Sequence, residues 1–311
     1  MEYQQNKFNR EYTLTYRPAV ESGITKTELI IENPITINFS IDRALYSAMN
    51  TMELDIYNLA GENRDYMYQD VQSKMGHVFL EAGYKGWSKS LIFAGDVINT
   101  YSYKSGVNVV THIRAFDSYA ALSIDTNQSF EAGTTTEDLV RVGQQDTGLE
   151  KGVYSFKNYK FVRGVSLVGN EWLAINKYVE GNAFIDLGRL YILGINEGWT
   201  PEYVEELGKY EVMVIDDSSG LLGTPQRNMS TLTVNMIFEP RVQVGQIVEL
   251  RSTVEPRYNG QYKIYGIKHN GIISDTVGGQ ATTTLELFTG STNFGGFRVI
   301  GQSQENITPA S

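Results

Sequence analysis

The 311-residue chain contains no cysteine, few histidines and no long apolar run. Without cysteine it can form neither a disulfide framework nor a thiolate metal site, which fits a reducing compartment. No stretch reaches the ~18 apolar residues that a membrane-spanning helix needs, so we expect no membrane insertion. The first twenty residues carry charges at Glu2, Lys7, Arg10, Glu11 and Arg17 without an apolar core, so we expect no signal peptide.

Basic charge is also scarce. The chain has 26 Lys and Arg against 36 Asp and Glu, a formal net charge of −10, and no basic run. Tight binding to phosphates needs clustered Lys and Arg, so free nucleic acid is not an expected partner. The length suggests roughly two domains and is sufficient to bury a core without disulfides or metal.

Patterns for metal binding and catalysis are missing too. His77, His112 and His269 lie far apart, and their spacing does not suggest a metal site. The chain has no Gly-x-Ser-x-Gly elbow, no phosphate-cradling glycine loop and no His-Glu-x-x-His. We therefore assign no catalytic, cofactor-binding or metal-binding residue, and we expect a protein that is not an enzyme.

Two acidic pairs and the tryptophans are the remaining candidates for a site. Asp216-Asp217 and Glu205-Glu206 could act as acid–base carboxylates, but positions in a turn and on a helix surface explain them better. Trp87, Trp172 and Trp199 could line a sugar groove. Because they do not cluster in the sequence, core and interface roles are favoured instead.

Short strand patterns dominate residues 209–290. Segments rich in β-branched and aromatic residues alternate with Gly, Pro, Asn and Asp, which is typical of antiparallel strands joined by tight turns. Asn259-Gly260 predicts a two-residue hairpin, and Gly278-Gly279 can form a second one. Roughly five strands in about 80 residues favour a small closed barrel, which removes exposed sheet edges.

The same pattern occurs earlier in the chain. The run from Met52 to Tyr57 matches the run from Leu232 to Ile237 in apolar phase. We infer two copies of one barrel, residues 35–117 and 210–288, with the same strand order and direction. The other matches pair 75–79 with 244–248, 93–95 with 264–266, the strand from Thr111 with that from Thr282, and a lead-in strand at 37–42 with 212–216.

Two features of the first half have no counterpart in the second. Tyr12, Leu14 and Tyr16 alternate with threonine, which predicts an edge strand before Pro18, and residues 28–31 can pair back with it. Residues 62–72 predict a short helix.

Residues 126–208 have a different rhythm and predict an inserted α/β module, placed at the periphery of the assembly. Thr134 and Glu137 form a capping-box pattern that starts a helix through Gln145. Its other predicted elements are a strand at 160–162, a helix at 170–179 with Trp172, Leu173, Ile175 and Val179 on its apolar side, strands at 184–186 and 190–193 joined through Gly188, and an acidic helix at 202–207 after Pro201.

The predicted fold class is therefore mainly β with a smaller α/β part: two similar antiparallel tube-like β-barrels and an inserted α/β module. The predicted divisions are 1–125 for the N-terminal arm and first barrel, 126–208 for the module, 209–290 for the second barrel and 291–311 for a flexible C-terminal tail. The tail is rich in Gly, Ser, Asn and Gln and could become ordered on a partner.

Several segments carry a resemblance to a known family. Residues 221–225, 237–246 and 259–271 resemble the central hub proteins of contractile phage-tail baseplates. In the first copy, 93–97 and 112–117 resemble the matching barrel, and 134–139 resembles the start of the family's inserted domain. The family is similar to the hub part of type VI secretion spike proteins. Those spikes usually carry a β-helical needle that this chain lacks, so we expect a separate spike protein.

The resemblance implies a structural role in the baseplate of the virion tail, assembled in the host bacterial cytoplasm. Three subunits with two barrels each would form a ring of six, seating the sixfold tail tube above and a threefold central spike below. Implied partners are a tail tube or tube-initiator protein, the spike and other baseplate proteins. DNA would pass without specific binding through an acidic channel on the order of 20 Å or more, wider than the ~12 Å major groove.

Three alternatives stay open at this point. The chain could be a receptor- or carbohydrate-binding tail module, which would show an aromatic and amide groove. It could be the hub of a related contractile injection system. It could also be a cell-wall hydrolase, which would show paired carboxylates in a cleft.

Overall fold

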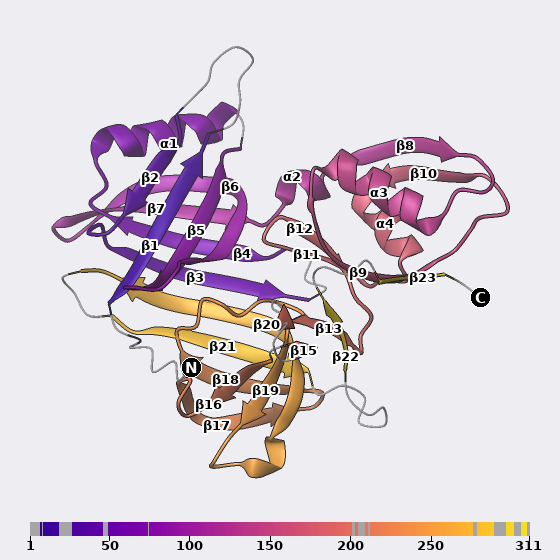
Figure 1. Cartoon of the computed structure of the whole chain (residues 1–311). Helices are drawn as coiled ribbons and strands as arrows, with labels where there is room; N and C mark the ends of the chain where they lie inside the picture. The colour runs from indigo at the N-terminus through magenta and orange to yellow at the C-terminus, as the bar shows by residue number, and fades with distance from the viewer. Residues whose placement is uncertain are drawn as a thin grey trace.

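A computed structural model describes residues 7, 9–18, 27–45, 49–73, 75–200, 203–204, 209–210, 212–275, 279–288, 297–301 and 306–309. As predicted, the chain is mostly β, and a sheet of thirteen strands forms its main body (Figure 1). The strands of this sheet are β1 (Arg10–Arg17), β2 (Leu29–Glu32), β3 (Ile37–Ala44), β4 (Thr51–Tyr57), β5 (His77–Tyr84), β6 (Ser90–Ser105), β7 (Asn108–Phe116), β16 (Met213–Asp216), β17 (Leu221–Asn228), β18 (Thr231–Ile237), β19 (Ile247–Arg251), β20 (Gly260–Ile273) and β21 (Ala281–Phe288).

The sheet joins both halves of the chain. Its main path runs β17-β18-β21-β20-β3-β4-β7-β6-β5-β1-β2, while β19 pairs with β20 and with β16. The halves meet where β20 pairs with β3 in antiparallel register, from Gly266 opposite Ala44 to Ile273 opposite Ile37. Every other pair in the sheet is antiparallel too, apart from the parallel pair β16–β19.

The two halves repeat one strand order. The first contains the antiparallel series β4-β7-β6-β5 and the second the series β18-β21-β20-β19. Even an irregularity recurs, because the register shifts at Ile98 in β6 and at Tyr265 in β20. The predicted repeat of strand order and direction is thus confirmed over these strands. The closure of each half into a barrel stays a prediction.

The register of the repeat was predicted correctly for one strand pair only. Met52 lies opposite Ala115 as Leu232 lies opposite Leu287, which agrees with the sequence match. When Ile98 is aligned with Tyr265, the predicted match of 75–79 with 244–248 is off by one residue, as is that of the strand from Thr111 with the strand from Thr282. The match of 93–95 with 264–266 is off by four residues. A one-residue slip exchanges the buried and exposed faces of a strand, so these two one-residue errors set core-facing residues against residues of the opposite face.

The lead-in match was wrong. Both β3 and β17 pair with the next strand of their own repeat, so the counterpart of β3 is β17. The segment at Met213–Asp216 instead forms β16, which lies beside β19 in parallel. Both candidates alternate apolar and polar residues, and the sequence does not tell which neighbour each of them chooses.

Two turn predictions also need comment. Asn259-Gly260 does not form a two-residue hairpin, because β19 ends at Arg251 and a 3-10 helix, η2 (Pro256–Tyr258), precedes β20. The Asn259 side chain instead accepts a hydrogen bond from the backbone N–H of Ser252 at 2.7 Å. Gly278, the first residue of the other predicted turn, lies outside the described residues.

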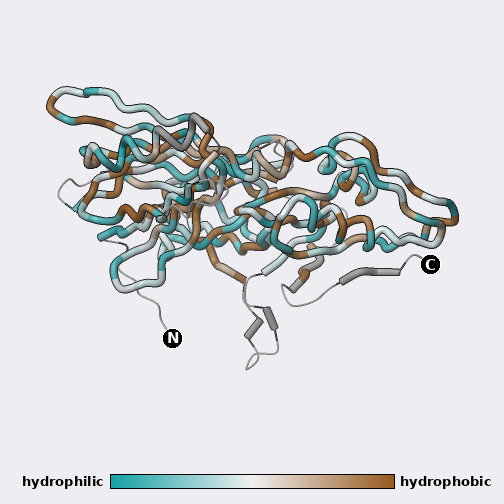
Figure 2. The backbone as a smooth tube through the Cα atoms, turned by 90° about the horizontal axis from the view of Figure 1, so that it is seen from above, coloured by the Kyte–Doolittle hydropathy of each residue, from teal (hydrophilic) through white to brown (hydrophobic). Residues whose placement is uncertain are grey.

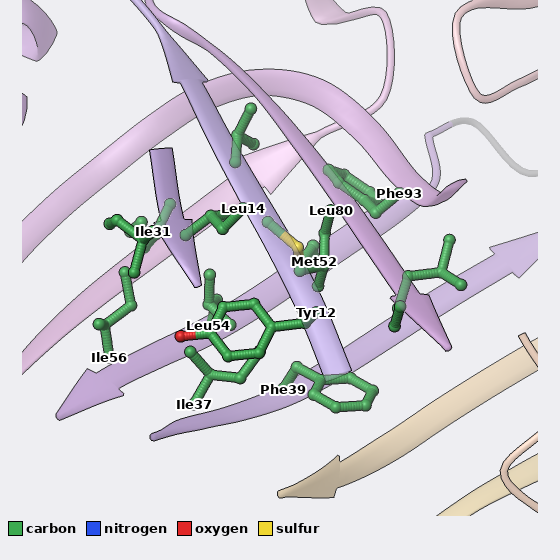
Figure 3. Packing of buried hydrophobic residues seen from close by; sticks show 14 of the residues in the cluster. Tyr12, Leu14, Ile31, Ile37, Phe39, Met52, Leu54, Ile56, Leu80 and Phe93 are labelled. Atoms are coloured by element: carbon green, nitrogen blue, oxygen red, sulfur yellow. The ribbon is translucent and has the colours of Figure 1, made fainter. Parts of the chain in front are cut away.

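The N-terminal strands complete the core of the first half. β2 pairs back with β1 as predicted, but β1 lies between β2 and β5 and is therefore no edge strand. The predicted helix is α1 (Gly61–Ser73), and its Met67 is buried in the same core. Figure 3 shows this core, where Tyr12 and Leu14 of β1 meet side chains of β3, β4, β5 and β6.

The inserted module lies to one side of the sheet (Figure 1). It has its own cluster of buried apolar side chains, among them Val140, Ile175 and Leu190. Its elements are α2 (Tyr119–Leu122), β8 (Asp125–Phe130), α3 (Thr136–Thr147), β9 (Glu150–Asn158), β10 (Val165–Asn170), α4 (Glu171–Tyr178), β11 (Ala183–Asp186) and β12 (Arg189–Ile192), joined by the C-terminal strand β23 (Asn306–Pro309). Two further strand pairs follow the module: β13 (Glu197–Thr200) with β22 (Arg298–Gly301), whose Trp199 and Ile300 belong to the core of the second half, and β14 (Tyr203–Val204) with β15 (Lys209–Tyr210).

The two long helices of the module were predicted, with a shift in one cap. The capping box of α3 uses Thr135 and Asp138, one residue later than the predicted pair Thr134 and Glu137. Asn170 caps α4, and its Oδ1 accepts a hydrogen bond from the backbone N–H of Leu173 at 3.1 Å. The Leu173 side chain is exposed, so it does not belong to the apolar side of the helix.

Three predictions near the module differ from the structure. The strand at 160–162 is absent, since Lys160 forms only a single bridge with Thr135. Of the helix predicted at 202–207, residues 203–204 form the strand β14, which pairs with β15, and the other residues lie outside the described ones. The segment 291–311, predicted as a mobile tail, contributes β22 beside β13 and β23 beside β9.

A buried ion pair connects the module to the first half. Arg43 of β3 donates to Asp186 of β11 through Nε at 2.8 Å and Nη2 at 2.6 Å, and both side chains are buried. Its Nη1 donates to the carbonyl of Ile92 in β6 at 3.2 Å. A buried pair of this kind is costly to break from one side, because the partner charge is left unpaired.

Asp117 extends this buried group. Its carboxylate accepts the backbone N–H groups of Leu187 at 2.7 Å and Gly188 at 3.1 Å, which form the corner between β11 and β12. Burial, followed by the nearby charge of Asp186, raises the pKa of Asp117 to about 6. Asn50 donates to Asp186 at 3.2 Å and so links the two carboxylates to the loop after β3. These contacts fix the module against β3.

The neighbouring strand β21 leaves no room for a side chain at Gly271 of β20. A Cβ atom there would lie 2.4 Å from Cβ of Ala281 on the neighbouring β21, whereas a Cβ at Gly266 on the same strand would meet nothing closer than 3.5 Å. We expect Gly271→Ala to lower the free energy of unfolding by about 1–3 kcal/mol through overpacking. Gly266→Ala is the matched control. Equal losses in urea unfolding would contradict this account of the β20–β21 pair.

His269 makes the stability depend on pH. It is fully buried on β20, and burial, with a smaller contribution from Arg43, lowers its pKa to about 3. Because this lies below the ordinary value of ~6.5, the stabilisation is present above pH ~6.5 and is lost as the pH falls toward ~3. Between pH 6.5 and 5 we expect wild type to lose about 2 kcal/mol more than His269→Gln.

A second variant separates protonation from hydrogen bonding. His269 Nδ1 lies 2.9 Å from Oγ1 of Thr283. Thr283→Val removes this contact at every pH, so we expect it to shift the unfolding midpoint equally at pH 6.5 and pH 5. A pH slope in His269→Gln as steep as in wild type would show that another group carries the acid sensitivity.

Candidate functional surface

One face of the joined sheet is polar and open. In β3, Ile37, Phe39 and Ile41 point into the core, while the residues between them point to the other side. The same alternation continues across β4, β7, β20 and β21. We call this surface the polar sheet face; its members are Asn38, Ser40, Asp42, Glu53, Asp55, His112, Arg114, Lys268, Asn270, Thr284 and Glu286.

Acidic side chains outnumber basic ones on this face. Four members carry a carboxylate and two carry a cation, and each cation lies near an acid. Arg114 Nε is 3.8 Å from Glu53, and Lys268 Nζ is 3.9 Å from Asp42. Such exposed pairs contribute little to stability. They do neutralise the basic groups, so that Asp55 and Glu286 leave the face net acidic.

A shallow hollow of about 260 Å³ lies within the polar sheet face. Asp55 Oδ1 and His112 Nδ1 meet there at 2.7 Å, beside the ring of Tyr101 at 4.9 Å between centroids. Amide, hydroxyl and carboxylate groups from β3, β4 and β20 form the rest of the lining. The hollow therefore offers hydrogen bonds to a polar surface that lies against it.

The histidines do not come together. His77 Nε2 pairs with Asp96 at 3.0 Å on β5 and β6, His112 pairs with Asp55, and His269 is buried on β20. Among the residues that the structure describes, no group of three or more His, Asp or Glu could hold a metal ion. Nor does the described part contain a helix long and apolar enough to cross a membrane.

The other candidates from the sequence have structural roles. Asp216 accepts hydrogen bonds from Ser218 and Ser219 within a turn, and Asp217 accepts one from Thr253. Glu205-Glu206 lies outside the described residues. The tryptophans stay apart, as inferred: Trp87 packs on the core of the first half, Trp199 is buried in that of the second, and Trp172 packs on the module.

Two open strand edges border the polar sheet face, and the sequence analysis missed both. One is β17, at the end of the sheet path; the other is the distal part of β6, residues 99–105. Closed barrels were predicted, and closure would have removed such edges. The alternation of tyrosine with small polar residues at 100–103 was the available signal, since it places two rings on one exposed face.

Hydrophilic and hydrophobic stretches are interspersed along the described part of the backbone in Figure 2. The polar sheet face and its two open strand edges form the candidate functional surface.

Comparisons with solved structures show the same fold in two tail proteins. The tail protein of Neisseria meningitidis MC58 has a TM-score of 0.56 at 12% identity over 89% of this chain and 96% of that one. The 43 kDa tail protein of prophage MuSo2 from Shewanella oneidensis has a TM-score of 0.55 at 10% identity, covering 90% and 96%. Identities this low show the fold alone.

A third similar structure belongs to a secretion system. The E. coli c3393 protein, a component of the type VI secretion system with similarity to the T4 tail proteins gp27 and gp5, has a TM-score of 0.53 at 10% identity, covering 85% of this chain and 76% of that one. No curated protein matches the sequence. The profile of one family, baseplate hub gp41, matches residues 18–275, which confirms the resemblance seen in the sequence. Since that match covers most of the chain, the protein belongs to the baseplate hub gp41 family.

Proposed function

We propose that this baseplate protein is a homotrimeric central hub, which joins the sixfold tail tube to the threefold central spike and forms part of the DNA channel. The observation that carries the proposal is the repeat. Each chain contributes two copies of a four-strand series to one sheet, β17-β18-β21-β20 and β3-β4-β7-β6. Three chains therefore present six similar units to one partner and three identical chains to the other, which is what an adaptor between these symmetries requires.

The dimensions of the sheet are compatible with a DNA channel. Eight strands per chain lie between β17 and β6, so three chains would supply twenty-four. At a spacing of ~4.8 Å these would close into a cylinder roughly 37 Å across between backbones. Strand tilt widens the cylinder and inward side chains narrow it. The remaining lumen would be wider than about 20 Å. A duplex needs a channel of this order, because it is wider than its own ~12 Å major groove.

The charge of the polar sheet face supports its place on the channel wall. Its side chains are hydrophilic, and the acidic ones outnumber the basic ones. A basic wall would bind phosphates by releasing counterions and would hold the DNA. An acidic wall repels phosphates, so DNA slides through without specific binding. The role is structural, and catalysis has no part in it.

The proposed partners follow from this position in the tail. The hub contacts the tail tube or a tube-initiator protein on its upper side and a separate spike protein on its lower side. Other baseplate proteins surround it. A peripheral place for the inserted module is supported by its position to one side of the sheet in Figure 1 and by its contact with Arg43, which is buried on the core side of β3. The protein is assembled in the host cytoplasm and resides in the virion tail.

Charge reversal on the polar sheet face tests the channel wall. We expect the wild-type chain not to bind double-stranded DNA tightly at ~50 mM salt. The double variant Glu53→Lys, Glu286→Lys should gain at least about tenfold in affinity, and the gain should disappear near 200 mM salt. Fluorescence anisotropy of labelled duplex measures both. Tight, strongly salt-dependent binding by wild type would overturn the sliding channel.

A matched control places the same two reversals elsewhere. Glu131 and Glu137 are exposed on the inserted module, so Glu131→Lys, Glu137→Lys changes the net charge equally. We expect this variant to gain less affinity for DNA, because its charges lie off the proposed channel wall.

An electron-microscopy map of the assembled baseplate measures the copy number of the protein. Two or four copies around the axis would overturn the trimeric adaptor.

A further inference from the structure

The cations of the inserted module differ in whether they have an acidic neighbour. Two of its arginines do, since Arg141 Nη2 is 3.4 Å from Asp138 and Arg189 Nε is 3.1 Å from Glu150. The third arginine, Arg163, forms no ion pair with any residue that the structure describes. In a chain of net charge −10, a cation without a carboxylate beside it is unexpected.

Arg163 belongs to a stretch that is rich in cations. We call residues 157–163 the basic segment; it runs from the end of β9 toward β10 (Figure 1) and reads Lys-Asn-Tyr-Lys-Phe-Val-Arg. Lys157, Lys160 and Arg163 are all exposed. Within the described part of the chain none of the three forms an ion pair, so their charges are available to a partner.

Helix α4 adds a fourth cation beside the basic segment. The rings of Phe161 and Tyr178 meet edge to face with their centroids 5.5 Å apart, and Tyr159 Oη donates to Glu180 Oε1 at 3.2 Å. These two contacts place the segment beside the end of α4. The exposed Lys177 lies there, with its Nζ 5.9 Å from the centre of the Tyr178 ring.

The backbone of the basic segment is held in place by the start of the neighbouring helix α3. The N–H of Phe161 donates to the carbonyl of Thr134 at 2.9 Å, and its carbonyl accepts the N–H of Gly133 at 2.7 Å. The carbonyl of Tyr159 accepts the N–H of Thr136 at 2.9 Å. Because this backbone is already ordered, a partner would not have to immobilise it, and the entropy cost of binding is lower.

An apolar side chain lies among these cations. Val162 is 94% exposed, directly before Arg163 and two residues after Lys160. A partner that covers Val162 gains from burial of its apolar surface. The segment thus favours a ligand that carries acidic and apolar groups close together.

We propose that the basic segment and Lys177 bind an acidic peptide segment of a partner protein, with an apolar side chain among its carboxylates. The carboxylates would pair with Lys160, Arg163 and Lys177, and the apolar side chain would cover Val162. Charge complementarity supports this occupant, because the cations have no acidic partner within the described chain. The inference goes beyond the proposed hub role and does not depend on the trimer.

The aromatic rings of the site favour a peptide over a nucleic acid. Proteins that bind single strands stack bases on free aromatic faces. Here Phe161 is half-buried against Tyr178, and Lys177 covers the Tyr178 ring. The most exposed apolar group is the aliphatic Val162, which suits a side chain better than a base.

The carboxylates beside the segment favour a short acidic ligand over a membrane. Glu137 accepts a hydrogen bond from Asn158 Nδ2 at 3.2 Å, and Glu180 accepts one from Tyr159. An anionic bilayer would face these carboxylates together with the cations, whereas a short peptide can avoid them. A single valine also offers less apolar surface than membrane-bound segments usually insert.

Binding of a defined peptide to the full-length chain tests the site. The probe is a soluble, fluorescently labelled peptide of glutamate and leucine, and its analogue with glutamine for glutamate is the uncharged reference. In fluorescence anisotropy at ~50 mM salt we expect only the acidic probe to bind. Lys160→Glu, Arg163→Glu should weaken binding at least about tenfold, because two attractive contacts become repulsive. Val162→Ser should weaken it about threefold.

A matched control reverses two cations elsewhere. Lys85 and Arg257 are exposed and lie outside the module, so Lys85→Glu, Arg257→Glu changes one lysine and one arginine and alters the net charge equally. We expect its affinity for the acidic probe to stay within about twofold of wild type, because salt screens distant charges. A loss as large as in Lys160→Glu, Arg163→Glu would show that net charge alone governs binding and would overturn the site.

Two further probes separate the other classes of ligand. Labelled oligothymidine represents a nucleic acid, and vesicles of phosphatidylglycerol represent an anionic membrane. Tighter binding of either one than of the acidic peptide, lost in Lys160→Glu, Arg163→Glu, would overturn the acidic partner. Failure of wild type to bind the acidic peptide would overturn it as well. None of these measurements depends on the copy number of the hub, so such a failure leaves the proposed trimer standing.

Discussion

The antiparallel ladder between β3 and β20 is the constraint on which the rest of this structure depends. It merges two repeats into one sheet, from Gly266 opposite Ala44 to Ile273 opposite Ile37. Without this ladder the strands of each repeat would form a separate, shorter sheet. The polar sheet face would then be divided into two parts. Because the ladder continues the face from β18 to β7, one chain presents a curved wall with two open ends. The proposed channel follows from repeating this one contact.

The register of β20 against β3 is fixed because a slip would bury polar side chains and expose apolar ones. Moving β20 by one residue along β3 would turn Lys268 into the core and Ile267 to the open face. The Arg43–Asp186 ion pair also restrains β3, because it holds the Arg43 side chain against the module on the core side of that strand. Gly271 constrains the neighbouring pair of strands instead, since the backbones of β20 and β21 approach too closely there for any side chain. The inserted module thus stabilises the junction from behind while staying off the polar face.

The fold could be predicted from the sequence as far as side-chain periodicity reaches. Alternation located β4, β18 and β21, and it identified the repeat, because alternation depends on the face that a strand buries. It could not choose between β16 and β17 as the partner of the following strand, since neighbours are set by contacts distant in sequence. The Asn259-Gly260 signal failed because η2 and the Ser252 contact gave that loop a longer path. The charged members of the polar face were visible individually, but only the register placed Asp42 beside Lys268 and Glu53 beside Arg114.

The β3–β20 junction inside the chain and the proposed contact between the open edges of neighbouring subunits differ in what stabilises them. This difference bears on assembly. Inside the chain, β3 and β20 are tethered, and buried groups such as Arg43 and His269 fix them in one register. The open edges carry Tyr101, Tyr103, Gln226 and Asn228, none of which is buried or charged. A contact between subunits must also overcome the loss of translational and rotational freedom, which costs several kcal/mol. The β3–β20 junction is therefore permanent, whereas the proposed contact between subunits depends on the concentration of the chain. A hub built this way would fold as a single chain first and would close its proposed ring only when enough subunits are present.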